Sequence, residues 1–255
     1  MTTIRDIFKT LCGIAPLELQ MGFDNAGFQL GRIDREARRV LLALDVTDAV
    51  AEEARSDGAE LIISHHPLIF SPLKAVTDAD PVQKRALYLI ENRIALISMH
   101  TNLDVAEGGV NDVLIRLLGA EPEAPLDADG CGRIGSLPEP MLLSAFLERS
   151  KDILHAPALR YCKGEDLVSR IAVMGGSGGG SLEDAVRLGC DTYVTADVKY
   201  HQFQRAAECG LTLIDADHFY TENPIIPALA ERLREEFPGV EFRVSQEHRA
   251  CIRFA

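Results

Sequence analysis

Histidine and carboxylate side chains gather where three predicted strands end. In strand order, these residues are His65 and His66, then His100 and Asp104, then Asp215, Asp217, His218 and Glu222. In open α/β sheets, ligands bind at the carboxyl ends of the strands. Imidazole and carboxylate groups suit zinc, iron, nickel or manganese, whereas calcium and magnesium prefer oxygen alone. A single histidine of this kind is usually an ordinary hydrogen-bonded residue, but a set on three loops predicts a metal site.

His65 and His66 are neighbours directly after the apolar run 60–64. Adjacent side chains on an extended segment point in opposite directions, so we expect the two rings to bind different ions. Pro67 favours an extended backbone at His66 because it disfavours the helical conformation in the residue before it. Paired ions in hydrolytic sites lie about 3.5–4 Å apart and need a bridging group, for which Glu222 is the candidate.

The segment 218–224, HFYTENP, predicts the start of a helix. Thr221 is the expected N-cap, Glu222 then lies in the first turn, and Pro224 is still early enough to be tolerated. His218 is expected in the preceding loop. This arrangement departs from the H-E-x-x-H helix of zinc metalloproteases, so we reject that class.

A glycine-rich run extends from Gly175 to Ser181, between a predicted strand and a predicted helix. Its backbone N–H groups and the helix N-terminus can hold an anion, but the run matches no complete nucleotide-binding motif. A tight turn that needs positive φ explains it equally well. Ser177 fits the G-x-S-x-G nucleophile elbow, yet a run this rich in glycine fits almost automatically, and a serine hydrolase therefore ranks low.

The elements that must position these residues alternate between strands and helices. Short β-branched runs predict strands at 38–45, 60–64, 93–98, 170–174, 191–195, 211–215 and 240–244. Segments with helical periodicity lie at 47–58, 80–93 and 181–189. This alternation predicts the α/β class with mainly parallel sheets.

The chain also repeats itself. Residues at a spacing of 131 positions correspond, so that Gly58 aligns with Gly189 and Ser64 with Thr195, in both cases around a helix, a glycine and an apolar strand. Generic αβ units also share such a period, and chance similarity is the alternative to duplication. The Pro- and Gly-rich stretch 119–140 suits a connection. We therefore expect two similar α/β halves, residues 1–125 and 126–255.

Composition sets outer limits on the function. The 255 residues are 47% hydrophobic and carry a net charge of −13, which makes nucleic acid an improbable partner. No apolar run is long enough for a membrane span, and the N-terminus lacks the apolar core of a signal peptide. The six cysteines contain no C-x-x-C pair. A cytoplasmic location is expected.

Six motifs carry a resemblance to a known family: GFDNAGFQLG (22–31), ALDVT (43–47), LIISHHPLIF (61–70), ISMHTNLDVAEGGVND (97–112), YVTADVKYHQ (193–202) and DADHFYTE (215–222). Together they resemble the Nif-three-like family, whose bacterial members are often labelled GTP cyclohydrolase I type 2 homologues. The resemblance runs over nearly the whole chain. It implies two similar α/β halves around a central metal-binding cleft, assembled as a homohexamer, in the short form that lacks an inserted domain.

The resemblance also implies a set of site residues. The family's ligands for two divalent ions fall on His65, His66, Asp104, His218 and Glu222, and Glu222 contacts both ions. His100 and His201 match further motif positions and either bind substrate or orient ligands. Phe23 replaces the tryptophan that many members carry, which affects the shape of the cleft entrance.

The activity implied by the family label is the hydrolytic opening of the guanine imidazole ring of GTP, with release of formate. Divalent ions activate water for such an attack, and Glu222 or His100 is the expected catalytic proton carrier. Two alternatives stay open. One is a di-metal hydrolase of another nucleotide or a phosphate ester, and the other is a ring that binds metal for regulation without catalysis. The native metal is not determined by a His and carboxylate set.

Overall fold

The computed structural model describes residues 1–254, and their contacts form two compact units. The first unit comprises Met1–Ala106 and Ile226–Arg249, and the second comprises Glu107–Ile225 with the described residues from Ala250 onward. This division differs from the expected boundary near residue 125. The reason is that helix α5 (Val110–Leu117) packs on strands of the second unit, whereas the chain returns to the first unit after Ile225.

A five-stranded sheet forms the centre of the first unit, in the order β1-β4-β3-β2-β10. Its strands are β1 (Gly27–Leu30), β2 (Arg39–Ala43), β3 (Leu61–Ser64), β4 (Ala95–Ser98) and β10 (Glu241–Val244). All neighbours pair in parallel except the edge strand β1, which is antiparallel to β4. Because β3 and β4 are parallel neighbours, the residues that follow them lie at the same end of the two strands.

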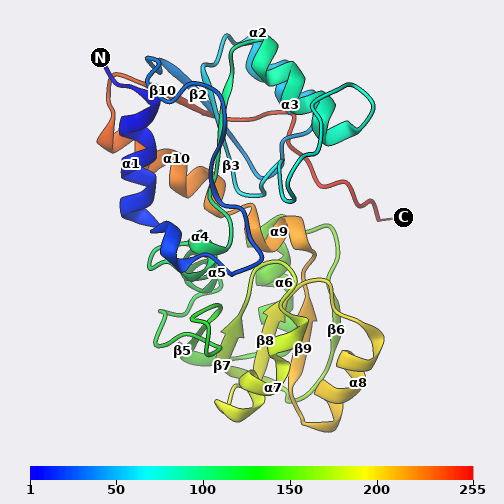
Figure 1. The fold of residues 1–255 in the computed structure, drawn as a ribbon. Coiled ribbons are helices and arrows are strands. Elements are labelled where there is room, and N and C mark those ends of the chain that lie inside the picture. The colour runs from blue at the N-terminus through cyan, green and yellow to red at the C-terminus, as the bar shows by residue number, and fades with distance from the viewer. Residues whose placement is uncertain (255) are drawn as a thin grey trace. The chain divides into compact units, whose positions relative to one another are not determined.

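Helices cover both faces of this sheet. They are α1 (Ile4–Ile14), α2 (Asp48–Ser56), α3 (Pro81–Glu91), α4 (Thr101–Val105) and α10 (Ile225–Glu236), with a 3-10 turn η1 (Leu17–Leu19). Figure 1 shows α2 and α3 together on one side of the strands and α1 and α10 on the other. Because both faces are covered, the residues of β3 are all buried, as expected for a parallel sheet.

Helices α2 and α3 begin directly after the first residue of each predicted helical segment. The Thr47 hydroxyl accepts the backbone N–H of Val50 at 3.2 Å, and the Asp80 carboxylate accepts that of Val82 at 2.9 Å, so both residues act as N-caps. Pro81 then occupies the first helical position of α3, where its missing N–H costs nothing. The helices predicted at 47–58 and 80–93 are confirmed as α2 and α3.

The second unit contains its own five-stranded sheet, in the order β5-β7-β8-β9-β6. Its strands are β5 (Arg133–Leu142), β6 (Arg160–Cys162), β7 (Leu167–Val173), β8 (Thr192–Thr195) and β9 (Thr212–Asp215). The central strands β7, β8 and β9 are parallel, and the edge strands β5 and β6 are antiparallel to their neighbours. Each unit therefore contains three consecutive strands that are parallel neighbours, β2, β3 and β4 in the first and β7, β8 and β9 in the second, and β10 adds a fourth parallel strand to the first unit.

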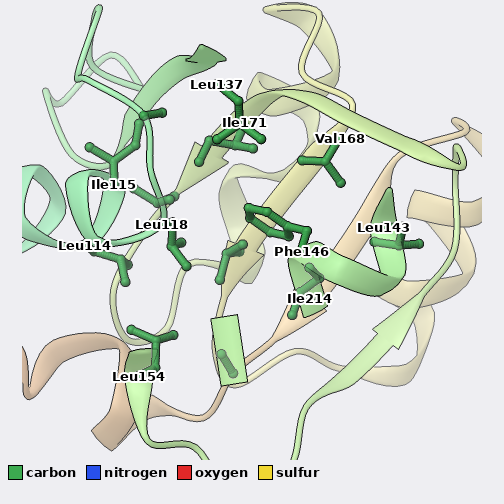
Figure 2. Close-up of a cluster of buried hydrophobic side chains, with 14 of the residues drawn as sticks. Leu114, Ile115, Leu118, Leu137, Leu143, Phe146, Leu154, Val168, Ile171 and Ile214 are labelled. Atoms are coloured by element: carbon green, nitrogen blue, oxygen red, sulfur yellow. The ribbon is translucent and has the colours of Figure 1, made fainter. Parts of the chain in front are cut away.

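Two apolar cores hold the helices of the second unit to its sheet. These helices are α5, α6 (Leu143–Leu154), α7 (Leu182–Arg187), α8 (Tyr200–Glu208) and α9 (His218–Glu222), with a 3-10 turn η2 (Gly179–Ser181). Phe146 of α6 is fully buried among Val168, Ile171 and Ile214, and Leu114 of α5 joins the same cluster (Figure 2). Leu182 of α7 and Ala206 of α8 belong to the other core cluster.

The sequence did not predict three of the strands, namely β1, β5 and β6. All three are antiparallel edge strands. Strand β5 contains Gly135, Pro138 and Pro140, residues that argue against a strand in the sequence but are tolerated at an edge, where register shifts interrupt the pairing. The seven predicted strands are all present, and this includes the parallel core of each unit.

His248 anchors the last part of the first unit and makes its stability depend on pH. Its Nδ1 accepts the backbone N–H of Leu44 at 3.0 Å, and burial lowers its pKa below 6.5. Below about pH 6.5, His248 therefore binds a proton more readily in the unfolded chain than in the folded one. The contribution of His248 to the free energy of unfolding is complete above about pH 6.5 and declines as the pH falls below it.

We expect His248→Asn to reduce this pH dependence, because the amide oxygen can replace Nδ1 as acceptor and does not titrate. Urea unfolding at pH 5, 6 and 7 measures the effect, which is at most about 1.4 kcal/mol per pH unit for one proton. An identical slope for both proteins would contradict the assignment.

Candidate metal centre

His65 and His66 lie directly after β3, and His65 is almost completely buried. The Nδ1 atom of His65 lies 2.8 Å from the carbonyl oxygen of Met99, and its Nε2 lies 3.5 Å from Asp104 Oδ1. Asp104 belongs to α4, which begins just after β4. Two neighbouring parallel strands thus bring His65 and Asp104 together, as predicted.

His66 is held by a carboxylate that the sequence analysis did not assign. Its Nδ1 lies 2.8 Å from Asp45 Oδ1, and Asp45 follows strand β2. The backbone carbonyl of His66 accepts the Ser64 hydroxyl at 2.8 Å. The ring and the backbone of His66 are therefore both fixed from the sheet edge.

His100 is held in the same way by Asp24, whose side chain is fully buried. The His100 Nδ1 to Asp24 Oδ1 distance is 2.7 Å, and Thr101 donates its backbone N–H to the other oxygen at 3.1 Å. Burial alone would raise the pKa of Asp24, but the hydrogen bonds from His100 and Thr101 outweigh it and lower the pKa to about 2. Asp24 is therefore ionised at neutral pH and orients His100.

The three histidines of the first unit form one group. One ring nitrogen from each of His65, His66 and His100 can be chosen so that all three lie within 4.8 Å of one another. The ring centroids of His65 and His66 are 5.0 Å apart. The expectation that these neighbours point in opposite directions is therefore wrong, because β3 ends at Ser64 and the alternation of an extended strand does not continue through the pair.

This group has the donor set of a borderline divalent ion. The acceptors at Nδ1 place the ring proton there, so the lone pair that binds metal is on Nε2 of each ring. Zinc–nitrogen bonds of about 2.0–2.1 Å put two ligands of a tetrahedral ion about 3.4 Å apart. Atoms already within 4.8 Å need only a small adjustment to reach that spacing. The residues fit a metal ion.

The second unit carries its ligand candidates on the short helix α9. His218 is the first residue of α9 and Glu222 is the last, and Asp217 is the N-cap that accepts the backbone N–H of Phe219 at 3.0 Å. The predicted N-cap at Thr221 and the loop position of His218 are therefore wrong. The helix is capped by Asp217, four residues before the predicted cap. Pro224 lies in the turn before α10.

Because both residues lie in α9, His218 and Glu222 are one helical turn apart on the same face of the helix. The His218 Nε2 to Glu222 Oε2 distance is 3.0 Å, and the Glu222 side chain is only 5% exposed. His218 Nδ1 lies 2.8 Å from Asp197 Oδ2, just after β8. Asp197, which follows β8, thus holds His218 in the same way that Asp45, which follows β2, holds His66.

The glycine run encloses this pair. Gly176 has φ of 65°, and a Cβ atom there would lie 2.1 Å from Glu222 Oε1 and 3.1 Å from His218 Nε2. The Gly175 amide donates to Asn111 at 2.9 Å, the Gly176 amide to Thr221 at 3.0 Å and the Gly178 amide to Thr195 at 3.1 Å. Since these amides are used within the unit, the tight-turn interpretation is favoured over an anion cradle.

Other predicted residues lie elsewhere. Ser177 is exposed in the glycine run, and His201 is exposed in the first turn of α8. The residues that sequence reasoning missed are Asp24, Asp45 and Asp197. Their signal was present, because each lies in a motif that carried the family resemblance. Asp45 is the last residue of the predicted strand 38–45, and Asp197 comes two residues after the predicted strand 191–195.

Two exposed aromatic rings border the histidine group of the first unit. The Phe70 ring centroid lies 6.4 Å from that of His100, in an edge-on arrangement, and the Phe23 centroid lies 6.4 Å from that of Phe70. Phe23 is 69% exposed and Phe70 is 48% exposed. Both rings therefore offer faces on which a planar group can stack.

Across residues 1–254, no helix combines the length and the apolar character required to span a bilayer.

Known proteins resemble this chain over nearly its full length. Residues 2–250 match the family described as Duf34/NIF3 (NGG1p interacting factor 3). A Clostridium perfringens protein named GTP cyclohydrolase 1 type 2 homolog is 36% identical, with 98% of this chain and 99% of that protein covered. A Nostoc protein of the same name is 40% identical over 78% of both chains.

The likeness extends to the fold. A crystal structure described as a Bacillus cereus protein related to NIF3 matches with a TM-score of 0.90 and 27% identity. The match covers 100% of this chain and 99% of that one.

Proposed function

The chain belongs to the Duf34/NIF3 family, and from this premise we propose that it is a dinuclear-metal-dependent hydrolase of the GTP cyclohydrolase type. The proposal depends on one observation above all. Each of His65, His66, His100 and His218 has its Nδ1 held by an oxygen acceptor. Histidines that bind metal almost always have such a partner, which fixes the tautomer and the ring orientation.

His65, His66, Asp104, His218 and Glu222 would hold the two ions, with Glu222 as the ligand that both ions would share. The donor types support this assignment, since imidazole and carboxylate ligands suit zinc, iron, nickel or manganese. Two such ions supply Lewis acidity and activated water for hydrolysis. The Glu222 carboxylate has only 5% of its side chain exposed and lies 3.0 Å from His218 Nε2, so an imidazole and a carboxylate are already held side by side as ligands.

The proposed substrate is GTP, as the names of the relatives suggest. Hydrolysis of the imidazole ring adds two waters across the carbon between its nitrogens, breaks both of its C–N bonds and releases that carbon as formate. His100 and Glu222 are the proposed proton carriers. His100 donates its Nδ1 proton to Asp24, which fixes the ring orientation and leaves Nε2 as the atom that exchanges protons with the substrate.

The direct test is an assay of formate release from GTP, with protein purified anaerobically and its metal content measured. We expect turnover that depends on two ions per chain. Protein that holds two ions but releases no formate from GTP would refute the cyclohydrolase activity. Hydrolysis of another nucleotide or of a phosphate ester by the same preparation would identify that compound class as the substrate instead.

Phe70→Ala is expected to raise KM for GTP by roughly ten-fold or more and to change kcat little, because stacking of a base on an aromatic ring is worth about 1–3 kcal/mol. Phe70→Trp should retain a low KM. Tyr200→Ala removes another exposed aromatic ring, on α8, and serves as the control. Equal KM values for Phe70→Ala and wild type would show that the guanine ring does not stack there.

The assembly proposed by resemblance is a homohexamer in the cytoplasm. Light scattering coupled to size exclusion tests it, with an expected mass of six times the 27.9 kDa chain.

A further inference from the structure

A cavity of the first unit is lined by arginine. It has a volume of about 760 Å³, and Arg32, Arg35 and Arg93 line it together with Glu91 and the apolar side chains of Ile90 and Ile94. Cavities of roughly 300–1,000 Å³ are typical of small-molecule sites. Three guanidinium groups against one carboxylate give the cavity a positive lining in a chain whose net charge is −13.

The positive charge of this cavity is not neutralised by its acidic neighbours in the sequence. Asp34 pairs with Arg5 at 2.7 Å, and Glu36 pairs with Arg38 at 2.8 Å. Neither Arg32 nor Arg93 forms an ion pair within the described part of the chain. Arg35 donates Nη1 to the backbone carbonyl of Arg93, so the two segments that carry the arginines are joined.

The backbone of Arg93 adopts a left-handed conformation at the end of α3. Helix α3 ends in a Schellman motif, in which Ile94 N–H donates to Leu89 at 2.8 Å and Arg93 N–H donates to Ile90 at 3.0 Å. Arg93 has φ of 57°, a left-handed conformation that is costly for residues other than glycine, asparagine and aspartate. Five other helices end in the same motif. Four of them carry glycine at this position, namely Gly58, Gly119, Gly189 and Gly210, and α6 carries His155 with φ of 56°.

The cavity lies away from the histidines of its own unit. Gly31 follows β1 and touches Ala95, the first residue of β4, whereas His100 comes after the end of β4. A four-residue strand is about 13 Å long. The arginines therefore lie at the amino-terminal end of β4, whereas the histidines of this unit lie beyond the carboxyl ends of β3 and β4.

We infer that this cavity binds a small molecule through a di- or triphosphate group, with the three guanidinium groups on the phosphates and the Ile90 side chain, 49% exposed, against the remainder. Guanidinium groups match phosphate oxygens in geometry and charge and form two parallel hydrogen bonds at once.

Calorimetric titration of the full chain with inorganic tripolyphosphate, in EDTA to exclude bound metal, tests the inference. We expect one site per chain, and an affinity at least ten-fold lower in Arg93→Gly and in Arg32→Ala. Arg93→Gly is the decisive variant, because glycine suits the left-handed backbone and the variant should melt at the same temperature as wild type or higher. Its loss of binding cannot then be attributed to misfolding.

Two controls separate this site from the rest of the molecule. Arg232→Ala removes an exposed arginine of α10 outside the cavity and should leave binding unchanged. Glu222→Gln should also leave it unchanged, which separates this site from the proposed hydrolase. Absence of tripolyphosphate binding to wild type, or unchanged binding in Arg93→Gly, would overturn the inference. Tighter binding of GTP than of tripolyphosphate identifies a nucleotide as the ligand, and equal binding identifies polyphosphate alone.

Discussion

Glu222→Gln is expected to lower formate release by a factor of about 100 or more and to remove at least one bound ion per chain. Glutamine keeps the shape of the side chain but loses the negative charge with which a carboxylate binds and bridges cations. Losing a residue that only supports a ligand already costs about 10- to 100-fold in affinity or activity, so losing a ligand should cost more. Metal analysis by mass spectrometry and the formate assay measure the two effects on one preparation.

The matched control is Glu235→Gln, which makes the same chemical change at an exposed position of α10. It should retain the metal content and turnover of wild type. A Glu222→Gln protein that keeps two ions would show that this carboxylate is not a metal ligand. The circular dichroism spectrum distinguishes loss of metal from loss of fold, since α9 and the glycine run should stay in place.

Gly176→Ala is expected to lower the free energy of unfolding by about 2–4 kcal/mol and to weaken metal binding at least ten-fold. The left-handed conformation at position 176, with φ of 65°, alone costs a residue with a Cβ atom about 1–2 kcal/mol. The added Cβ atom would also lie 2.1 Å from Glu222 Oε1, so the carboxylate must move away from His218. Urea unfolding and titration with zinc measure the two effects.

Gly180→Ala is the control from the same run. No atom lies within 4 Å of a Cβ placed there, and the backbone is outside the left-handed region. This variant should match wild type in stability and metal content. If both variants behave alike, the glycine run is a tolerant loop and does not shape the half of the site around Glu222.

Much of the fold could be predicted from the sequence, because its strands and helices carry local signals. Alternating apolar runs and helical periodicity located the parallel core of both sheets, and residues 131 positions apart, such as Ser64 and Thr195, revealed two similar units. The antiparallel edge strands were missed because β1 (GFQL) and β6 (RYC) contain no β-branched residue and β5 contains two prolines. The start of α9 was misplaced because Thr221 and Asp217 are both plausible caps, and only the backbone path decides between them.

The sequence by itself determined which residues are candidate ligands, since imidazole and carboxylate groups after parallel strands are recognisable from residue type and spacing. Only the tertiary structure decided how they are held. Asp24 is 76 positions from His100, and Asp45 is 21 positions from His66, and each pair meets because the sheet aligns the ends of distant strands. Residue type specifies what a side chain can bind, but contacts across such separations depend on the packing of the whole unit, which no local pattern contains.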